Sequence, residues 1–180
     1  MQQLTSKISF FSILLLLFVG SACAQEIPAD KPKVLNPDFD QKISSLLNFK
    51  VPLIGVEALK ENKEDYILLD AREEEEYNVS HIEGARYIGY NKLNIKELNI
   101  IPKDKKIVLY CSIGYRSEKI GERLQKMGYS QVFNLYGSIF EWANQGNLVV
   151  DQNGSPTKYV HGYNKSWSKW LDDSKVKKTW

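Results

Sequence analysis

The sequence predicts an α/β domain with a central, mainly parallel sheet of five strands flanked by helices. Short apolar runs alternate with amphipathic stretches, and the runs typical of strands are residues 51–54, 66–69, 86–88, 107–110 and 132–135. Of 180 residues, 43% are hydrophobic and 26% are charged, which suffices for one core rather than two. We therefore expect a single α/β domain.

The clearest predicted helix covers residues 117–127. Ile120, Leu124 and Met127 fall on one face of it, and Gly128 follows as a residue that ends helices. The acidic run at residues 73–76 is interpreted as the solvated first turn of another helix, because carboxylates suit the positive end of the helix dipole.

The charge balance bears on the class of partner. The chain has 24 basic and 22 acidic residues, a formal net charge of +2. Such a balance creates no general field that would draw the protein onto a polyanion. We therefore expect no nucleic-acid partner. Separately, we expect the protein to be a monomer.

Residues 1–24 have the composition of a secretory signal peptide. Lys7 precedes a nearly continuous apolar run at residues 8–19, and small residues follow at 20–22. The apolar run is shorter than the roughly 20 residues that a membrane-spanning helix needs. We therefore predict removal of this segment, export and a periplasmic location.

Two cleavage sites overlap at the end of this segment. Residues 22–24 have the form cut by the general signal peptidase, whereas residues 20–23 resemble a lipoprotein box. The second interpretation gives a signal of residues 1–22, a lipid anchor on Cys23 and a membrane-anchored lipoprotein, and the sequence leaves both open. In either case Cys111 is the only free thiol, because the chain has two cysteines.

Residues 25–42 are predicted to be a linker. The first part of this segment is polar, carries Pro28, Pro32 and Pro37, and shows no periodic apolar pattern.

The chemistry is carried by Cys111, which directly follows the strand run 107–110 and stands just before the predicted helix. A thiol at a helix N-terminus meets unpaired N–H groups and the positive dipole end, so its pKa falls below the roughly 8.5 of a free cysteine. Gly114 can adopt backbone angles that turn N–H groups toward the sulfur, and Arg116 adds a positive charge. The loop is therefore predicted to form a binding site for a small sulfur oxyanion or for the terminal sulfur of a persulfide.

The loop CSIGYRS, residues 111–117, resembles the active-site loop of rhodanese domains. Residues 68–88 resemble the family's Asp-x-Arg, Glu-Tyr and Gly-His-Ile-Pro-Gly-Ala segments, and residues 135–142 resemble its closing Gly-Gly-x-x-x-Trp element. The resemblance covers residues 43–149 as a rhodanese-like domain. Three positions depart from the family's usual glycine, proline and glycine: Ser80, Glu83 and Ser138.

The resemblance implies a thiosulfate sulfurtransferase-like enzyme. Cys111 would be the nucleophile that takes a sulfane sulfur from a thiosulfate-like anion and passes it, as a persulfide, to cyanide or a thiol acceptor. The expected substrate-binding residues are those that would hold the charged sulfur or its donor, namely Ser112, Ile113, Gly114, Tyr115, Arg116 and Ser117. Neither a metal nor an organic cofactor is implied.

Three polar residues outside the loop are expected to be structural. Asp70 and Arg72 should brace the loop without touching the sulfur, because an acid beside the thiolate would raise its pKa. His81 is expected to be a hydrogen-bonded packing residue rather than a general base.

Residues 150–180 form a C-terminal aromatic and basic extension beyond the resemblance. Trp167 and Trp170 are three residues apart, which predicts a short helix that packs back on the domain.

Two other functions stay open as alternatives. Cell-cycle dual-specificity phosphatases and some arsenate reductases share the rhodanese fold, but they space Cys and Arg one residue further apart than the four residues between Cys111 and Arg116. A non-catalytic or partner-specific sulfur-relay module is the alternative from another class. Inactive relatives usually lose the cysteine, so the presence of Cys111 favours catalysis.

Overall fold

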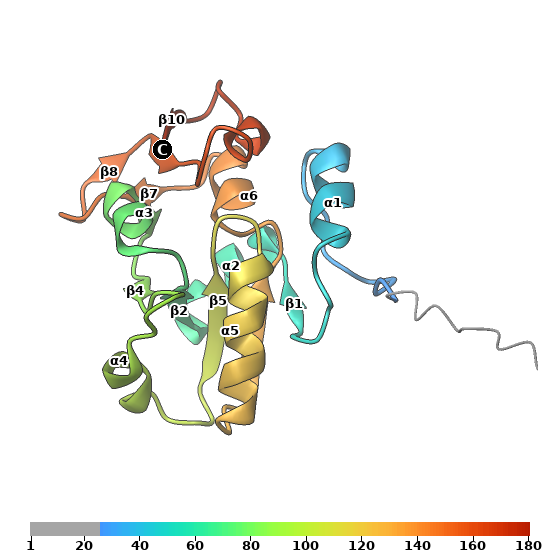
Figure 1. Cartoon of the computed structure of the whole chain (residues 1–180), viewed down its shortest axis with the longest axis vertical. Coiled ribbons are helices and arrows are strands. Elements are labelled where there is room, and N and C mark those ends of the chain that lie inside the picture. Colours follow the sequence, from blue (N-terminus) through green and yellow to red (C-terminus); the bar gives the residue numbers. More distant parts are fainter. Residues whose placement is uncertain (1–25) are drawn as a thin grey trace, which may run out of the picture.

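The computed structural model describes residues 26–180, and Figure 1 shows a central sheet with helices around it. The sheet has five strands in the order β1-β6-β5-β2-β4, and every neighbouring pair is parallel. Its strands are β1 (Leu53–Ile54), β2 (Ile67–Asp70), β4 (Arg86–Tyr87), β5 (Lys106–Tyr110) and β6 (Gln131–Leu135). Each coincides with one of the five predicted runs, so the predicted fold class is confirmed.

The central strand β5 separates two hydrophobic layers. Val108 and Tyr110 pack into the layer that contains Phe39 and Phe140, whereas Ile107 and Leu109 pack into the opposite layer. Alternate residues of a strand point to opposite faces of the sheet, so a strand that is apolar throughout is buried on both sides. This pattern is why the run 107–110 occupies the middle of a parallel sheet.

Six α-helices and two 3₁₀ turns are formed within the described part of the chain. They are α1 (Pro37–Ser44), α2 (Val56–Glu61), η1 (Lys63–Asp65), α3 (Glu74–Val79), α4 (Ile95–Asn99), α5 (Tyr115–Lys126), α6 (Ser138–Asn144) and η2 (Ser168–Trp170). Residues of α1 and α6 belong to one hydrophobic layer, and residues of α4 and α5 belong to the other. The sheet is therefore covered on both faces.

Helix α5 begins earlier and ends earlier than predicted. It starts at Tyr115 rather than at residue 117, because Gly114, with φ of 115°, is its N-cap. Ile120 and Leu124 are buried as expected, but Met127 lies past the last helical residue and is 37% exposed. Gly128 follows the helix end with φ of 90°, as predicted.

The predicted linker is wrong in its last part, because residues 37–44 form α1. The Asn36 side chain accepts hydrogen bonds from the first-turn N–H groups, and Pro37 at the start suits a helix. Phe39 and Ile43, four residues apart, are fully buried against the domain. One apolar pair in a short helix gives too little periodicity to detect in a polar, proline-rich stretch.

The C-terminal extension packs back on the domain, as predicted, although residues 168–170 form a 3₁₀ turn rather than an α-helix. At the boundary between domain and extension, β7 (Val149–Val150) pairs antiparallel with β3 (His81–Ile82) and β8 (Pro156–Thr157). Within the extension, β9 (Tyr159–His161) pairs parallel with β10 (Lys177–Thr179). Asn144 at the end of α6 donates a hydrogen bond of 2.8 Å to the Trp170 carbonyl. Figure 1 shows the extension, in red, beside α3 and α6.

The predicted signal segment and the proposed lipid-anchor residue Cys23 lie outside the described residues. Among residues 26–180, no helix is long and apolar enough to cross a membrane.

Candidate active site

The loop after β5 places a cysteine sulfur above the N-terminus of α5. Cys111 follows the last residue of β5, and the N–H of Gly114 donates a hydrogen bond of 3.2 Å to its Sγ. Gly114 can turn its N–H back toward the sulfur because it adopts a left-handed conformation, with φ of 115°. The sulfur therefore lies where unpaired N–H groups and the positive end of the helix dipole meet.

The backbone of the loop is anchored from β6 and α6. Asn134 donates a hydrogen bond of 3.0 Å from its side-chain N–H to the Gly114 carbonyl and accepts one of 2.7 Å from the Ser117 hydroxyl. Ser138, one of the departures from the rhodanese pattern, accepts a hydrogen bond of 3.1 Å from the Cys111 N–H. These hydrogen bonds fix the backbone of the loop and none of them involves the Cys111 sulfur.

An ion pair that the sequence did not predict lies beside the sulfur. Arg116 donates hydrogen bonds of 2.6 and 2.7 Å to the two carboxylate oxygens of Glu76, and one of 2.9 Å to the Ser112 hydroxyl. Ser112 in turn donates a hydrogen bond of 3.0 Å to Glu76. The expectation of a solvated acidic turn is therefore wrong for Glu76, which is buried because it pairs with a cation on α5.

Electrostatics favour the thiolate form of Cys111. Burial by itself raises the pKa of Cys111, but the charge of Arg116 and the N–H groups of Ser117 and Gly114 outweigh it and lower the pKa below its ordinary value. Burial likewise raises the pKa of Glu76, and its contacts with Arg116 outweigh that effect and lower it. The contacts with Arg116 thus favour the charged form of both the Cys111 thiol and the Glu76 carboxyl.

Asp70 and Arg72 form a second, fully buried ion pair behind the loop. Arg72 donates hydrogen bonds of 2.6 and 3.0 Å to the Asp70 carboxylate and one of 2.6 Å to the Ser80 carbonyl. The guanidinium carbon lies 5.8 Å from the ring centre of Tyr110, the residue before Cys111. The pair braces β5 and the end of α3, and its hydrogen bonds do not extend to the loop itself.

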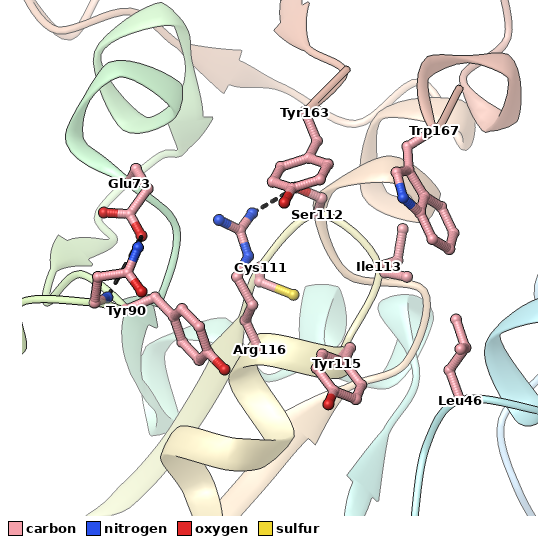
Figure 2. A pocket seen from close by; sticks show the side chains of 11 residues that line it. Leu46, Glu73, Tyr90, Cys111, Ser112, Ile113, Tyr115, Arg116, Tyr163 and Trp167 are labelled. Carbon is pink, nitrogen blue, oxygen red and sulfur yellow. Dashed lines mark hydrogen bonds between the residues drawn. The ribbon is translucent and has the colours of Figure 1, made fainter. Parts of the chain in front are cut away.

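A pocket of about 580 Å³ opens around the cysteine. Figure 2 shows the Cys111 sulfur pointing into the space between the side chains that line it. Four of the predicted binding residues line the pocket, namely Ser112, Ile113, Tyr115 and Arg116. Gly114 and Ser117 do not line it. Gly114 contacts the sulfur through its backbone N–H, and Ser117 is buried beneath the loop.

The fold and the cysteine loop agree with the comparison to protein-family models, in which residues 56–145 match the rhodanese-like domain. The chain belongs to the rhodanese-like domain family. It is 35% identical over 91 residues to a sulfurtransferase of Allochromatium vinosum, an overlap of 51% of this chain and 84% of that protein.

Two further relatives agree with this assignment. A probable adenylyltransferase/sulfurtransferase of Mycobacterium tuberculosis is 38% identical over 79 residues, which are 43% of this chain and 20% of the relative, so this chain spans only about a fifth of that protein's length. A crystal structure of a rhodanese-related protein from Thermoplasma volcanium superposes with a TM-score of 0.51 at 30% identity, covering 55% of this chain and 97% of that one.

The two histidines of the chain, His81 in the rhodanese-like domain and His161 in the C-terminal extension, contact neighbouring residues. His81 stacks on Tyr77 at 3.9 Å between ring centres, and its Nδ1 lies 3.1 Å from the Tyr77 carbonyl. Burial lowers the pKa of His161, whose Nδ1 accepts a hydrogen bond of 3.1 Å from the Tyr163 N–H. Within residues 26–180, no three His, Cys, Asp or Glu side chains come together as a metal site would require.

Sequence reasoning missed several residues of the pocket of this rhodanese-like domain. They come from segments far from the cysteine loop, namely Leu46, Glu73, Tyr90, Asn91, Tyr163 and Trp167. Leu46, Tyr163 and Trp167 also lie outside the segment that matches the family model. No local pattern could have assigned them, because their proximity to Cys111 depends on tertiary packing.

Proposed function

We propose that this protein is a sulfurtransferase that carries sulfur as a persulfide on Cys111. The observation that supports it best is the hydrogen bond of 3.2 Å from the Gly114 N–H to Sγ, at the mouth of α5 and beside Arg116. This arrangement stabilises a negative sulfur before the reaction, as thiolate, and after it, as persulfide. The relative named sulfurtransferase in Allochromatium vinosum is consistent with the proposal.

The first half-reaction transfers one sulfur atom to the enzyme. The Cys111 thiolate attacks the sulfane sulfur of a donor such as thiosulfate, a new S–S bond forms, and the donor's S–S bond breaks. The leaving group departs with the electron pair, which is sulfite in the case of thiosulfate. The charge balances, since a thiolate and a dianion give a persulfide anion and a dianion.

The second half-reaction discharges the persulfide. Cyanide or a thiolate acceptor attacks the terminal sulfur, and the electron pair of the broken S–S bond returns to Cys111 as thiolate. The loop N–H groups and Arg116 stabilise the negative charge on sulfur in both half-reactions. No step requires an oxidant or a reductant.

Intact mass spectrometry after incubation with a sulfane donor tests this proposal. The wild-type protein should gain one sulfur atom, lose it on addition of cyanide and release thiocyanate. Cys111→Ser should gain none, whereas Cys23→Ser, which removes the other cysteine of the sequence, should behave as wild type. Absence of added sulfur together with hydrolysis of an aryl phosphate would favour the phosphatase alternative, and inactivity in both assays would favour a binding or relay module.

We also propose that the protein is exported, as a periplasmic monomer or as a lipoprotein anchored through Cys23. The support is the apolar run at residues 8–19 and the small residues after it. Intact mass of the native protein distinguishes the outcomes: an N-terminus at Gln25, a diacylated Cys23, or an uncleaved chain that would contradict export by this route.

A further inference from the structure

The pocket around Cys111 is larger and more apolar than a small inorganic anion needs. Its volume of about 580 Å³ lies within the range of sites for organic ligands. Figure 2 shows aromatic rings on several sides of the sulfur. The apolar and aromatic lining residues are Leu46, Ile113, Tyr90, Tyr115, Tyr163 and Trp167.

The charges of the pocket do not favour a dianion. Among the described residues that line it, Arg116 is the only cation, and Glu76 already neutralises it through two hydrogen bonds of 2.6 and 2.7 Å. Glu73 adds a second carboxylate at the rim, so these three side chains carry one positive and two negative charges. The loop N–H groups can stabilise one negative sulfur atom, but a second charge on the ligand would find no free cation.

The C-terminal extension places an aromatic ring against the Arg116 guanidinium. The Tyr163 ring centre lies 5.1 Å from the guanidinium carbon of Arg116. Tyr163 adopts φ of 65°, which is rare for a bulky residue, and the hydrogen bond of its N–H to His161 holds it there. Trp167 continues this aromatic wall and is half-buried against the domain core.

We infer that the sulfur donor of Cys111 is an organic sulfane compound with an aromatic or apolar body and a single negative charge, rather than the thiosulfate dianion. This inference rests on the proposed function and specifies its substrate class. For a thiosulfonate, the Cys111 thiolate forms an S–S bond with the terminal sulfur, the S–S bond of the donor breaks, and an organic sulfinate leaves with the electron pair. Two negative charges stand on each side of this step.

The test compares three donors that transfer the same sulfur atom: benzenethiosulfonate, methanethiosulfonate and thiosulfate, each with cyanide as acceptor and thiocyanate as readout. We expect kcat/KM for benzenethiosulfonate to exceed that for methanethiosulfonate by about tenfold or more, because the ring is buried against apolar walls. Thiosulfate should be the poorest of the three. Because the two sulfinates also differ as leaving groups, variants must show that the pocket causes the preference.

Three variants serve this purpose. Tyr163→Ala and Trp167→Leu each remove part of the aromatic wall, and both should reduce the preference for the aromatic donor severalfold. Tyr163 is 49% exposed, so its removal costs little core packing. Trp180→Ala is the matched control, because Trp180 belongs to the same extension, is 63% exposed and does not line the pocket. It should keep the wild-type preference.

A binding measurement separates this inference from the proposed function. Titration calorimetry on Cys111→Ser, which cannot turn over, should detect benzenesulfinate but not sulfite, and Trp167→Leu in that background should weaken the binding. A thiosulfate kcat/KM above that of benzenethiosulfonate, an equal preference in all variants, or tighter binding of sulfite would overturn the inference while leaving the sulfurtransferase intact. Failure of every donor to load sulfur would instead refute the proposed function, and the calorimetry would still decide the ligand class.

Discussion

The carboxylate of Glu76 and the guanidinium of Arg116 meet beside the candidate nucleophile, with two hydrogen bonds of 2.6 and 2.7 Å between residues forty positions apart. Their side chains are only 4% and 12% exposed, respectively. The ion pair holds the positive charge of Arg116 next to Cys111 and keeps the Arg116 side chain from rotating toward solvent. Removing either partner should therefore change both the free energy of unfolding and the pKa of Cys111.

Glu76→Gln should destabilise the fold by about 3 kcal/mol, because it leaves Arg116 largely buried without a counter-charge. Urea unfolding measures this change. Glu75→Gln, at an exposed position of the same helix, should change the free energy of unfolding by less than about 0.5 kcal/mol. Equal effects of the two substitutions would show that the ion pair contributes nothing specific.

Acid should weaken the same interaction. Since Arg116 lowers the pKa of Glu76 in the folded state, the unfolded chain takes up the proton first as the pH falls. The stability that this carboxylate contributes is fully present above its unfolded pKa of roughly 4.3 and is lost as the pH falls through the lower folded value. The difference in unfolding free energy between wild type and Glu76→Gln should therefore be constant above about pH 5 and shrink below about pH 4. A difference that grows in acid would contradict this assignment.

Arg116→Gln should raise the pKa of Cys111, because the charge of Arg116 lowers it in the wild type. The rate of alkylation by iodoacetamide, followed against pH, reports the fraction of thiolate. The wild-type midpoint should lie below the roughly 8.5 of a free cysteine, and that of the variant above the wild-type value. Arg123→Gln, at an exposed position of α5, should leave the profile unchanged.

Gly114→Ala should slow persulfide formation roughly tenfold or more, because a side chain disfavours φ of 115° and the N–H would turn away from the sulfur. A Cβ there would meet its nearest neighbour at 3.6 Å, an ordinary contact, so the cost of about 1–2 kcal/mol comes from the backbone. Gly128→Ala, at φ of 90° in open space, is the matched control. It should lose similar stability and keep full activity.

Phe39→Ala should destabilise the domain by about 3–5 kcal/mol, because the ring is fully buried and lies 5.5 Å from the Trp170 ring, centre to centre. Thermal and urea unfolding measure the loss. Leu35→Ala, in the same segment but 65% exposed, should have little effect. A negligible effect of Phe39→Ala would mean that α1 behaves as the linker that its sequence predicts.

Much of the fold could be predicted from local patterns. Apolar runs such as 107–110 indicate strands buried on both faces, and the spacing of Ile120 and Leu124 indicates a helix with one buried face. The predicted helix start at residue 117 is two residues too late, because Gly114 is the cap and Tyr115 is the first helical residue. Helix α1 was missed because its two buried residues, Phe39 and Ile43, give too weak a period.

The sequence by itself determined the candidate nucleophile and its immediate setting, since Cys111, Gly114 and Arg116 are neighbours in the chain and their geometry follows from one strand, one turn and one helix start. Only the tertiary structure decided that Glu76 pairs with Arg116 and that Tyr163 and Trp167 wall the pocket. These residues come from α3 and from the C-terminal extension, and which distant segments meet is decided by how helices and strands pack on the sheet. The acidic run at residues 73–76 and the tryptophans of the extension can be recognised in the sequence. Which residues they contact is decided by the packing of the elements that carry them.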